Sequence, residues 1–188
     1  MRARLVGCLA ASVLLLFVVP SSAGANLPRL PSKLIVPFQS LGGVSIGESY
    51  AAAKKTWGAA SGNTSSCSEK GGGWCTYTTV TLGNASFQCY RQRVVQIAIG
   101  YDNSAKEKPE FSATPLNALK TASGIGLGSS FGKLAAAYPS GSVTSIFGAS
   151  TWKYGLIGPH NLRTYFVLDG RSPSARITQI QVFEPNPG

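Results

Sequence analysis

The fold of this chain is decided by a stretch that occurs twice, first as Gly43-Val44-Ser45-Ile46-Gly47-Glu48-Ser49-Tyr50 and again as Gly124-Ile125-Gly126-Leu127-Gly128-Ser129-Ser130-Phe131. In both stretches the order is glycine, aliphatic, small, aliphatic, glycine, any residue, serine, aromatic. The match continues in the following turns, where Trp57 corresponds to Tyr138. Since self-similarity within a chain is typical of repeat architectures, the pattern predicts a duplicated structural unit.

Each stretch predicts the start of a short amphipathic helix. Ser49 and Ser130 are placed as N-caps, whose hydroxyl oxygens accept hydrogen bonds from N–H groups of the first turn. Gly58 suits a helix end, and Pro139 cannot continue a helix. Each helix therefore has roughly nine residues, too few to be stable alone, so we expect each to lie on a sheet.

Alternating apolar and polar residues predict the sheets. Residues 93–99 correspond to residues 176–182, and in both segments one face is largely apolar while the glutamine points the other way. Hairpin turns are expected at residues 83–85 and 158–160, ahead of these strands. The sequence thus predicts an α+β fold of two tandem repeats, each a short helix packed on a three- to four-stranded antiparallel sheet.

The first 25 residues have the features of a secretory signal peptide. A basic start precedes an apolar run ending at Pro20, and Ala23-x-Ala25 fits a signal-peptidase site. The run is shorter than the roughly 20 residues that an anchor needs. Cys8 precedes the apolar run, so lipidation is not expected. We expect cleavage near Ala25, a secreted or envelope-associated protein, and no transmembrane segment after signal removal.

The mature chain is expected to have four parts. Residues 26–39 contain three prolines and form an extended N-terminal segment. Residues 40–102 form the first repeat and residues 120–188 the second. Residues 103–119 are polar and interrupted by proline, which is typical of a connector.

The basic charge of the chain has two interpretations, acidic partners or solubility. The net charge is +10, and removal of residues 1–25 deletes two arginines and no acid, leaving about +8. Wall polymers, anionic lipid surfaces and acidic proteins would all be attracted to such a chain. Only Lys54-Lys55 and Arg91-x-Arg93 are close-spaced, so we favour the interpretation in which scattered lysines keep an exported protein soluble. Nucleic acid is not an expected partner, because the chain is exported and lacks a basic stripe interleaved with aromatics.

Three cysteines remain in the mature chain, so one internal disulfide is the maximum. A Cys67–Cys75 bridge would close a glycine-rich loop, and a Cys75–Cys89 bridge would link neighbouring strands; both pairings stay open. A zinc site is not expected, because no C-x-x-C pair is present.

No catalytic constellation is evident, and we expect a protein without enzymatic activity, metal or cofactor. The sole histidine, His160, lies in a predicted turn, and a Ser-His-acid or Cys-His arrangement would have to use it. The glycines of residues 124–128 lack the final spacing and the preceding strand of a dinucleotide fingerprint.

A helix of this kind followed by a meander, twice over, resembles the exported tandem-repeat proteins typified by beta-lactamase inhibitory protein. It is also similar to the module of single-copy outer-membrane assembly lipoproteins. The resemblance implies a disulfide between Cys67 and Cys75, although the second copy has no cysteine pair. The residues that carry the resemblance are Gly47, Ser49, Tyr50, Gly58, Gly128, Ser130 and Phe131.

The resemblance also implies a concave sheet surface that grips a partner protein through aromatic side chains. In the competing interpretation about half of these aromatics pack under the helices. We expect an exported non-enzymatic binding protein, with a protein inhibitor as the sharpest version. The alternative is a basic envelope-associated protein that binds acidic wall polymer or lipid. The candidate binding residues are Trp74, Tyr77, Tyr90, Trp152, Tyr154 and Tyr165.

Overall fold

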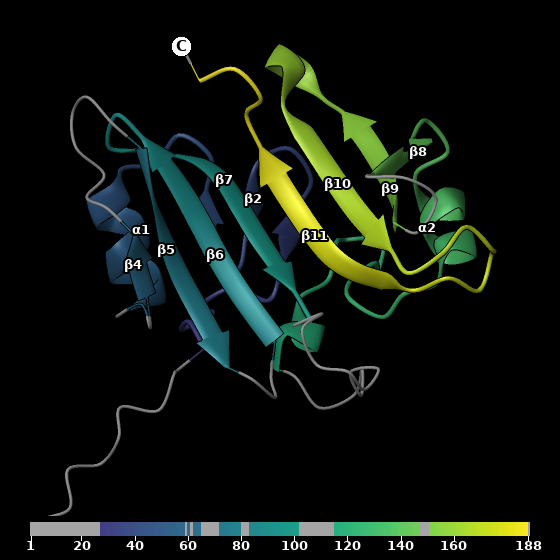
Figure 1. The fold of residues 1–188 in the computed structure, drawn as a ribbon, viewed down its shortest axis with the longest axis horizontal. Helices are drawn as coiled ribbons and strands as arrows, with labels where there is room; N and C mark the ends of the chain where they lie inside the picture. The colour runs from purple at the N-terminus through teal and green to yellow at the C-terminus, as the bar shows by residue number, and fades with distance from the viewer. Residues whose placement is uncertain are drawn as a thin grey trace, which may run out of the picture.

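A computed structural model describes residues 27–58, 60, 62–64, 72–79, 83–101, 115–146 and 151–187. The expected signal peptide lies outside these residues. The main element is one antiparallel sheet of eight strands, shown in Figure 1. In sheet order the strands are β4 (Gly62–Thr64), β5 (Gly72–Thr79), β6 (Gly83–Tyr90), β7 (Arg93–Gly100), β11 (Ile177–Phe183), β10 (Arg163–Leu168), β9 (Thr151–Ile157) and β8 (Ser142–Ile146).

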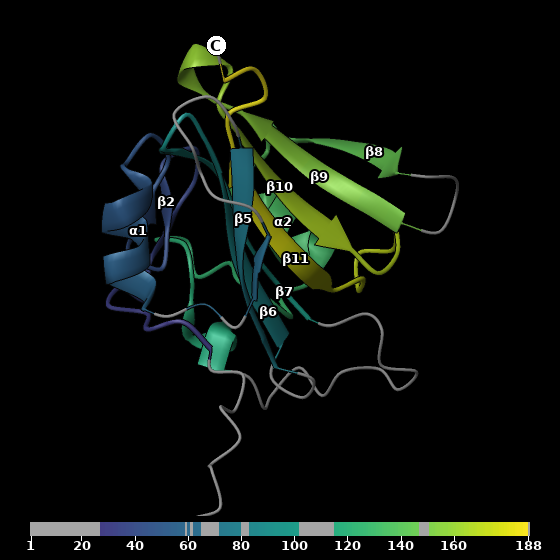
Figure 2. The same ribbon diagram turned by 60° about the vertical axis from the view of Figure 1, so that its left-hand side comes forward.

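A second layer covers one face of this sheet. It contains helices α1 (Tyr50–Trp57) and α2 (Phe131–Ala137), the 3-10 helix η1 (Pro115–Ala118) and a small sheet of β1 (Ile35–Val36), β2 (Ser40–Leu41) and β3 (Val44–Ser45). Figures 1 and 2 together place both helices on the same side of the main sheet. A short 3-10 helix, η2 (Pro159–Asn161), joins β9 to β10. Within the described residues, neither helix is long and apolar enough to cross a membrane.

The expected fold of two tandem helix-plus-sheet repeats is wrong. β7 and β11 pair with each other, from Gly100 opposite Gln179 to Gln96 opposite Phe183, so the two expected sheets are one continuous sheet. The additional three-stranded sheet was not expected, and the described structure is mostly sheet with two short α-helices.

Two separate sheets would each have an unpaired edge strand, and this explains why one continuous sheet forms instead. An edge strand presents a row of unsatisfied N–H and C=O groups, and pairing β7 with β11 satisfies both rows at once. β7 carries the signal for this pairing, because five of its residues in the run from Val94 to Ile99 are apolar and buried. A nearly continuous apolar run is typical of a strand inside a sheet and not of an edge.

The two predicted helix starts are confirmed. Ser49 accepts a hydrogen bond from the N–H of Ala52, and Ser130 accepts one from the N–H of Lys133. At both starts the preceding glycine has a positive φ, 83° at Gly47 and 74° at Gly128, where glycine is favoured. The repeated sequence pattern therefore encodes a local helix-start geometry.

Backbone hydrogen bonds tie both helix starts to the main sheet in the same way. Gly47 N–H donates to Val94 O at 2.7 Å, and Gly128 N–H donates to Ile177 O at 2.9 Å. An arginine at the start of each strand closes the junction: Arg93, the first residue of β7, donates its Nε to Gly47 O at 3.2 Å, and Arg176, just before β11, donates its Nη1 to Gly128 O at 2.8 Å. Each short helix is thus held by the sheet, as its length requires.

One of the two expected hairpin turns is misplaced. Residues 83–85 belong to β6, where Gly83 pairs with Thr79 and Ala85 with Tyr77, and residues 80–82 lie outside the described residues. The other expected turn is confirmed, because η2 lies between β9 and β10. Gly83 has φ 96°, and a Cβ there would lie 2.6 Å from Gly100 O, which explains a glycine at this strand end.

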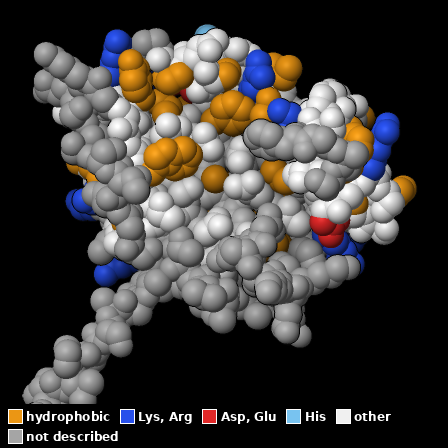
Figure 3. Space-filling view, in the orientation of Figure 1, with side chains coloured by type: hydrophobic (Ala, Val, Ile, Leu, Met, Phe, Trp, Pro, Cys, Tyr) orange, Lys and Arg blue, Asp and Glu red, His pale blue; other side chains and the backbone are white. Residues whose placement is uncertain are grey.

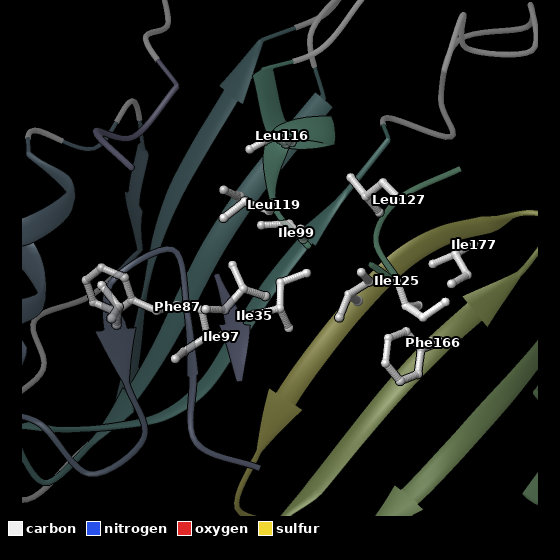
Figure 4. Packing of buried hydrophobic residues seen from close by; sticks show 14 of the residues in the cluster. Ile35, Phe87, Ile97, Ile99, Leu116, Leu119, Ile125, Leu127, Phe166 and Ile177 are labelled. Carbon is white, nitrogen blue, oxygen red and sulfur yellow. The ribbon is translucent and has the colours of Figure 1, made fainter. Parts of the chain in front are cut away.

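A single hydrophobic core lies between the two layers. Figure 4 shows Phe87 and Ile97 from the first half and Phe166 and Ile177 from the second, linked through intervening apolar side chains. Leu116 and Leu119, near the end of the expected connector, are fully buried in this core, as is Ile35. The core is therefore continuous across the β7–β11 junction.

Candidate functional site

The face of the main sheet opposite the helices is the principal exposed sheet surface, and it is called the open face below. Side chains alternate across the sheet. In β6, Ala85 and Phe87 are buried, and the Phe87 ring meets the Trp57 ring of α1 at 5.8 Å, whereas Ser86 and Gln88 are half-buried on the other side. Figure 3 shows this side of the molecule, with separate hydrophobic patches among polar atoms.

The strand register aligns the open-face residues in rows across the sheet, and two of these rows contain Trp74, Tyr165 and Phe183. None of the residues in these two rows is Asp or Glu, and both rows combine rings, amides or hydroxyls. The first row is Trp74, Gln88, Gln96, Phe183, Arg163 and Ile157. The second row is Thr76, Ser86, Ala98, Gln181, Tyr165 and Gly155.

An aromatic and cationic cluster forms where β9, β10 and β11 adjoin. The Tyr165 and Phe183 rings meet edge to face with centroids 4.8 Å apart. Lys153 Nζ lies 4.3 Å from the Tyr165 centroid, a cation–π distance. Arg163 Nη1 donates to the Tyr165 hydroxyl at 3.0 Å. These four residues are called the Tyr165 cluster.

Local features of the sequence make this cluster possible. Gly155 pairs with Tyr165, and a Cβ at Gly155 would lie only 3.1 Å from the ring, so glycine lets the ring lie close to the sheet. Arg163 Nε is buried without a hydrogen-bond partner among the described residues. An unsatisfied buried donor beside half-buried rings marks a place where a bound partner could add a hydrogen bond.

The structure divides five of the six candidate aromatics between the two faces. Trp74 and Tyr165 belong to the open-face rows, and Tyr90 has the same orientation in β6, with the Arg91 guanidinium 5.1 Å from its ring centroid. Trp152 and Tyr154 pair with Leu168 and Phe166 and share their helix-side face.

The helix-side aromatics contribute to packing. Tyr154 is 4% exposed, meets the Phe131 ring at 5.7 Å and donates its hydroxyl to Tyr138 O. Trp152 is half-buried against the core. The backbone of Tyr77 pairs with Ala85, and its side chain lies outside the described part of the structure.

Three residues of the Tyr165 cluster were missed in the sequence. Lys153, Arg163 and Phe183 carry no motif, and their faces depend on the register of three strands. A signal was nevertheless present in β10, where Thr164, Phe166 and Leu168 are buried and alternate with Arg163 and Tyr165. That alternation assigns Arg163 and Tyr165 to one face.

The cysteines are arranged differently from either expected pairing. Cys89 is disulfide-bonded. Cys75 is a buried thiol whose Sγ donates to the Tyr50 hydroxyl at 3.4 Å. Neither the Cys67–Cys75 nor the Cys75–Cys89 bridge is therefore present in this structure, and Cys67 itself lies outside the described residues.

His160 is exposed in η2 with φ 54°. Among the described residues no group of His, Cys, Asp and Glu side chains is placed to hold a metal ion. Glu48 lies near the start of α1, where its Oε2 accepts from Ser45 N–H at 3.1 Å. Burial raises the pKa of the Glu48 carboxyl, and the Ser45 hydrogen bond offsets part of that rise.

Two solved structures are similar to this chain at low identity. One is an extracellular protein containing an SCP domain from Bacillus anthracis, 10% identical, with a TM-score of 0.49 over 74% of this chain and 44% of that one. The other is a cysteine-rich secretory protein from Staphylococcus aureus, 11% identical, with a TM-score of 0.42 over 86% of this chain and 49% of that one. The chain spans less than half the length of either structure. No family model and no curated protein matches it.

The resemblance to beta-lactamase inhibitory protein is therefore corrected. The structural neighbours are SCP-domain and cysteine-rich secretory proteins, and their likeness is too loose to assign a function. The physical reason for the error is that the glycine, serine and aromatic pattern specifies a positive φ and an N-cap. Those features begin helices in many unrelated proteins.

Proposed function

We propose that this chain is an exported, non-enzymatic binding protein that holds an acidic partner protein against the open face of its main sheet. Export is supported by the charged start, apolar run and small-residue cleavage pattern of residues 1–25. Inhibition of an enzyme depended on the resemblance corrected above and is not part of this proposal.

The observation that carries the proposal is the Tyr165 cluster within the open face. Two rings, an ammonium and a guanidinium lie together there, and Arg163 Nε has no partner among the described residues. Aromatic residues and arginine are enriched in protein interfaces and at their energetic hot spots. The amides of Gln88, Gln96 and Gln181 in the adjoining positions supply donors and acceptors for a polar rim.

The absence of acids from the two rows supports an acidic partner in this proposal. The carboxylates among the described residues are those of Glu48, Asp169 and Glu184, and none belongs to either row. An acidic patch on the partner would meet Lys153 and Arg163 without repulsion from like charges. Such complementarity raises the association rate and selects among partners.

The experiment is a pull-down of secreted proteins from the host, with the exported protein as bait, at physiological and at high salt. Wild type is compared with Tyr165→Ala, Arg163→Ala and Lys55→Ala. Lys55 is exposed on α1, so its variant removes one positive charge on the opposite side of the molecule.

We expect a stoichiometric partner that is retained by wild type and Lys55→Ala and lost from the two open-face variants. Loss of at least about tenfold in affinity is expected from each, because a hot-spot residue is worth about 2 kcal/mol or more. Equal binding by all four proteins would refute a role for the open face.

A second candidate function is attachment to an acidic wall polymer or lipid surface through charge alone. It is favoured by the excess of Lys and Arg over Glu48, Asp169 and Glu184 among the described residues. Binding to washed envelopes should then decline steeply with salt, because the Debye length is about 10 Å at 0.1 M. Lys55→Ala and Arg163→Ala should weaken such binding equally.

A further inference from the structure

A second polar surface lies on the helix side of the molecule, away from the open face. It is a cleft of about 870 Å³ between the end of η1, the loop before α2, and the turn that leads into β11. In Figure 1 the yellow turn that leads into β11 lies beside α2. The residues of this α2 cleft that bear on its chemistry are Asn117, Lys120, Ser129, Lys133, Ser174 and Arg176.

The charge in the α2 cleft has one sign. Lys120, Lys133 and Arg176 come from three separate segments, and none of the described residues that line the cleft is Asp or Glu. Three cations without a carboxylate repel one another. A bound anion would offset this repulsion.

Lys120 is built into the wall of the cleft. A Cβ at Gly126 would lie 2.6 Å from Lys120 Cδ, 2.9 Å from its Nζ and 2.3 Å from Leu119 O. Glycine at position 126 is therefore needed, because any side chain there would clash with the Lys120 side chain that lies against it. Lys120 Nζ donates to Leu127 O at 3.3 Å, and an ammonium has three donors, so further donors remain for a ligand.

Arg176 is fixed from two sides. Its Nη1 donates to Gly128 O at 2.8 Å, and its backbone N–H donates to Asp169 Oδ1 at 2.7 Å. The guanidinium has five N–H donors in a planar fork, which suits the oxygens of a phosphate. Ser129 Oγ accepts from Gly126 N–H at 3.1 Å, so its hydroxyl proton is available as a donor.

We propose that the α2 cleft binds a phosphate-bearing ligand, with Lys120 and Arg176 as the anchoring cations. A phosphate carries the multiple negative charge that three cations require, and a single carboxylate does not. The volume of the cleft exceeds that of one phosphate. Asn117, Ser129 and Ser174 supply polar groups to a hydroxylated organic portion of the ligand. This site is independent of the partner proposed for the open face.

The test measures binding by isothermal titration calorimetry with inorganic phosphate and glycerol phosphate, against sodium chloride at matched ionic strength. Sedimentation with phosphatidylcholine vesicles, with and without phosphatidylglycerol, distinguishes a lipid headgroup from a soluble phosphate. The proteins compared are wild type, Lys120→Gln, Lys133→Gln, Arg176→Gln and the charge-matched control Lys55→Gln.

We expect Lys120→Gln and Arg176→Gln each to weaken phosphate binding by at least about tenfold, because hydrogen bonds from a charged donor are stronger than those from a neutral one. Lys55→Gln should bind phosphate as wild type does. Lys133 is exposed on α2, so its replacement should leave the fold intact. Weaker phosphate binding by Lys133→Gln would therefore support the site even if Lys120→Gln fails to fold. Binding confined to phosphatidylglycerol vesicles, with the same dependence on the variants, assigns the phosphate to a lipid. No binding of any phosphate probe, or equal weakening by Lys55→Gln, overturns the proposal.

Discussion

Tyr165 and Phe183 meet edge to face across β10 and β11 on the open face, with centroids 4.8 Å apart and ring planes inclined by 70°. Eleven residues before Tyr165 in the chain, Tyr154 lies on the opposite face of the same sheet and is 4% exposed. Two tyrosines on adjacent, paired strands therefore have different roles, and the difference can be measured.

Tyr154→Ala should destabilise the protein by about 3–5 kcal/mol, because it opens a cavity against Phe131 and the core. Tyr165→Ala should cost only about 1 kcal/mol, mainly the value of one half-buried ring pair. Chemical denaturation followed by fluorescence gives both free energies of unfolding. Equal costs would mean that the two faces are assigned wrongly.

Trp57 is the largest fully buried side chain and joins α1 to both sheets. Its ring meets Phe87 at 5.8 Å, and its Nε1 donates to Gly42 O at 3.2 Å. Trp57→Ala should therefore lower the free energy of unfolding by about 3–5 kcal/mol. Trp57→Phe keeps much of the volume and should cost less, about 1–3 kcal/mol, because Gly42 O loses its donor. A smaller loss for Ala than for Phe would contradict this packing.

Tyr101 is 5% exposed and donates its hydroxyl to Asn117 Oδ1 at 2.5 Å. Burial raises the pKa of this phenol to about 12. Because the raised pKa favours the neutral form in the folded state, its contribution to stability is present below pH about 10 and declines as pH rises through about 12.

Tyr101→Phe should be less stable than wild type by about 1 kcal/mol at neutral pH, and the difference should shrink above pH about 10. Unfolding of both proteins across the alkaline range provides the measurement. A tyrosinate absorbance titration of wild type should contain a late step that is missing from Tyr101→Phe. A difference in stability that grows with pH would refute the assignment.

Glu48 should make the protein less stable at neutral pH than in mild acid, relative to a neutral side chain at the same position. Burial raises the pKa of its carboxyl, and Oε1 is buried without a partner among the described residues. A raised pKa favours the protonated form, so the contribution of Glu48 is greatest below the ordinary pKa of the group and declines as pH rises through the raised one.

Glu48→Gln removes this charge and should unfold at a higher temperature than wild type at pH about 7, with the difference shrinking as pH falls through the titration of the carboxyl. Thermal unfolding of both proteins at several pH values checks the trend. Lys55→Gln, which changes an exposed charge on α1, serves as the control and should show no such trend. The prediction would be contradicted if wild type became more stable relative to Glu48→Gln as the pH rises.

Local geometry could be predicted from the sequence alone. Ser49 and Ser130 are helix N-caps, Gly47 and Gly128 have positive φ, and η2 joins two strands where a turn was expected. Each of these features depends on the preferences of a few consecutive residues, which is why a short pattern sufficed.

Only the tertiary structure decided how the strands join and which aromatics are exposed. The pairing of β7 with β11 joins residues about eighty positions apart, and no local pattern specifies the partner of a strand edge. The same holds for the Tyr165 cluster, where Phe183 reaches Tyr165 through strand register, and for the α2 cleft, where Lys120 lies over Gly126. The chain encodes its turns and caps locally, whereas its surfaces arise from burial of one continuous core.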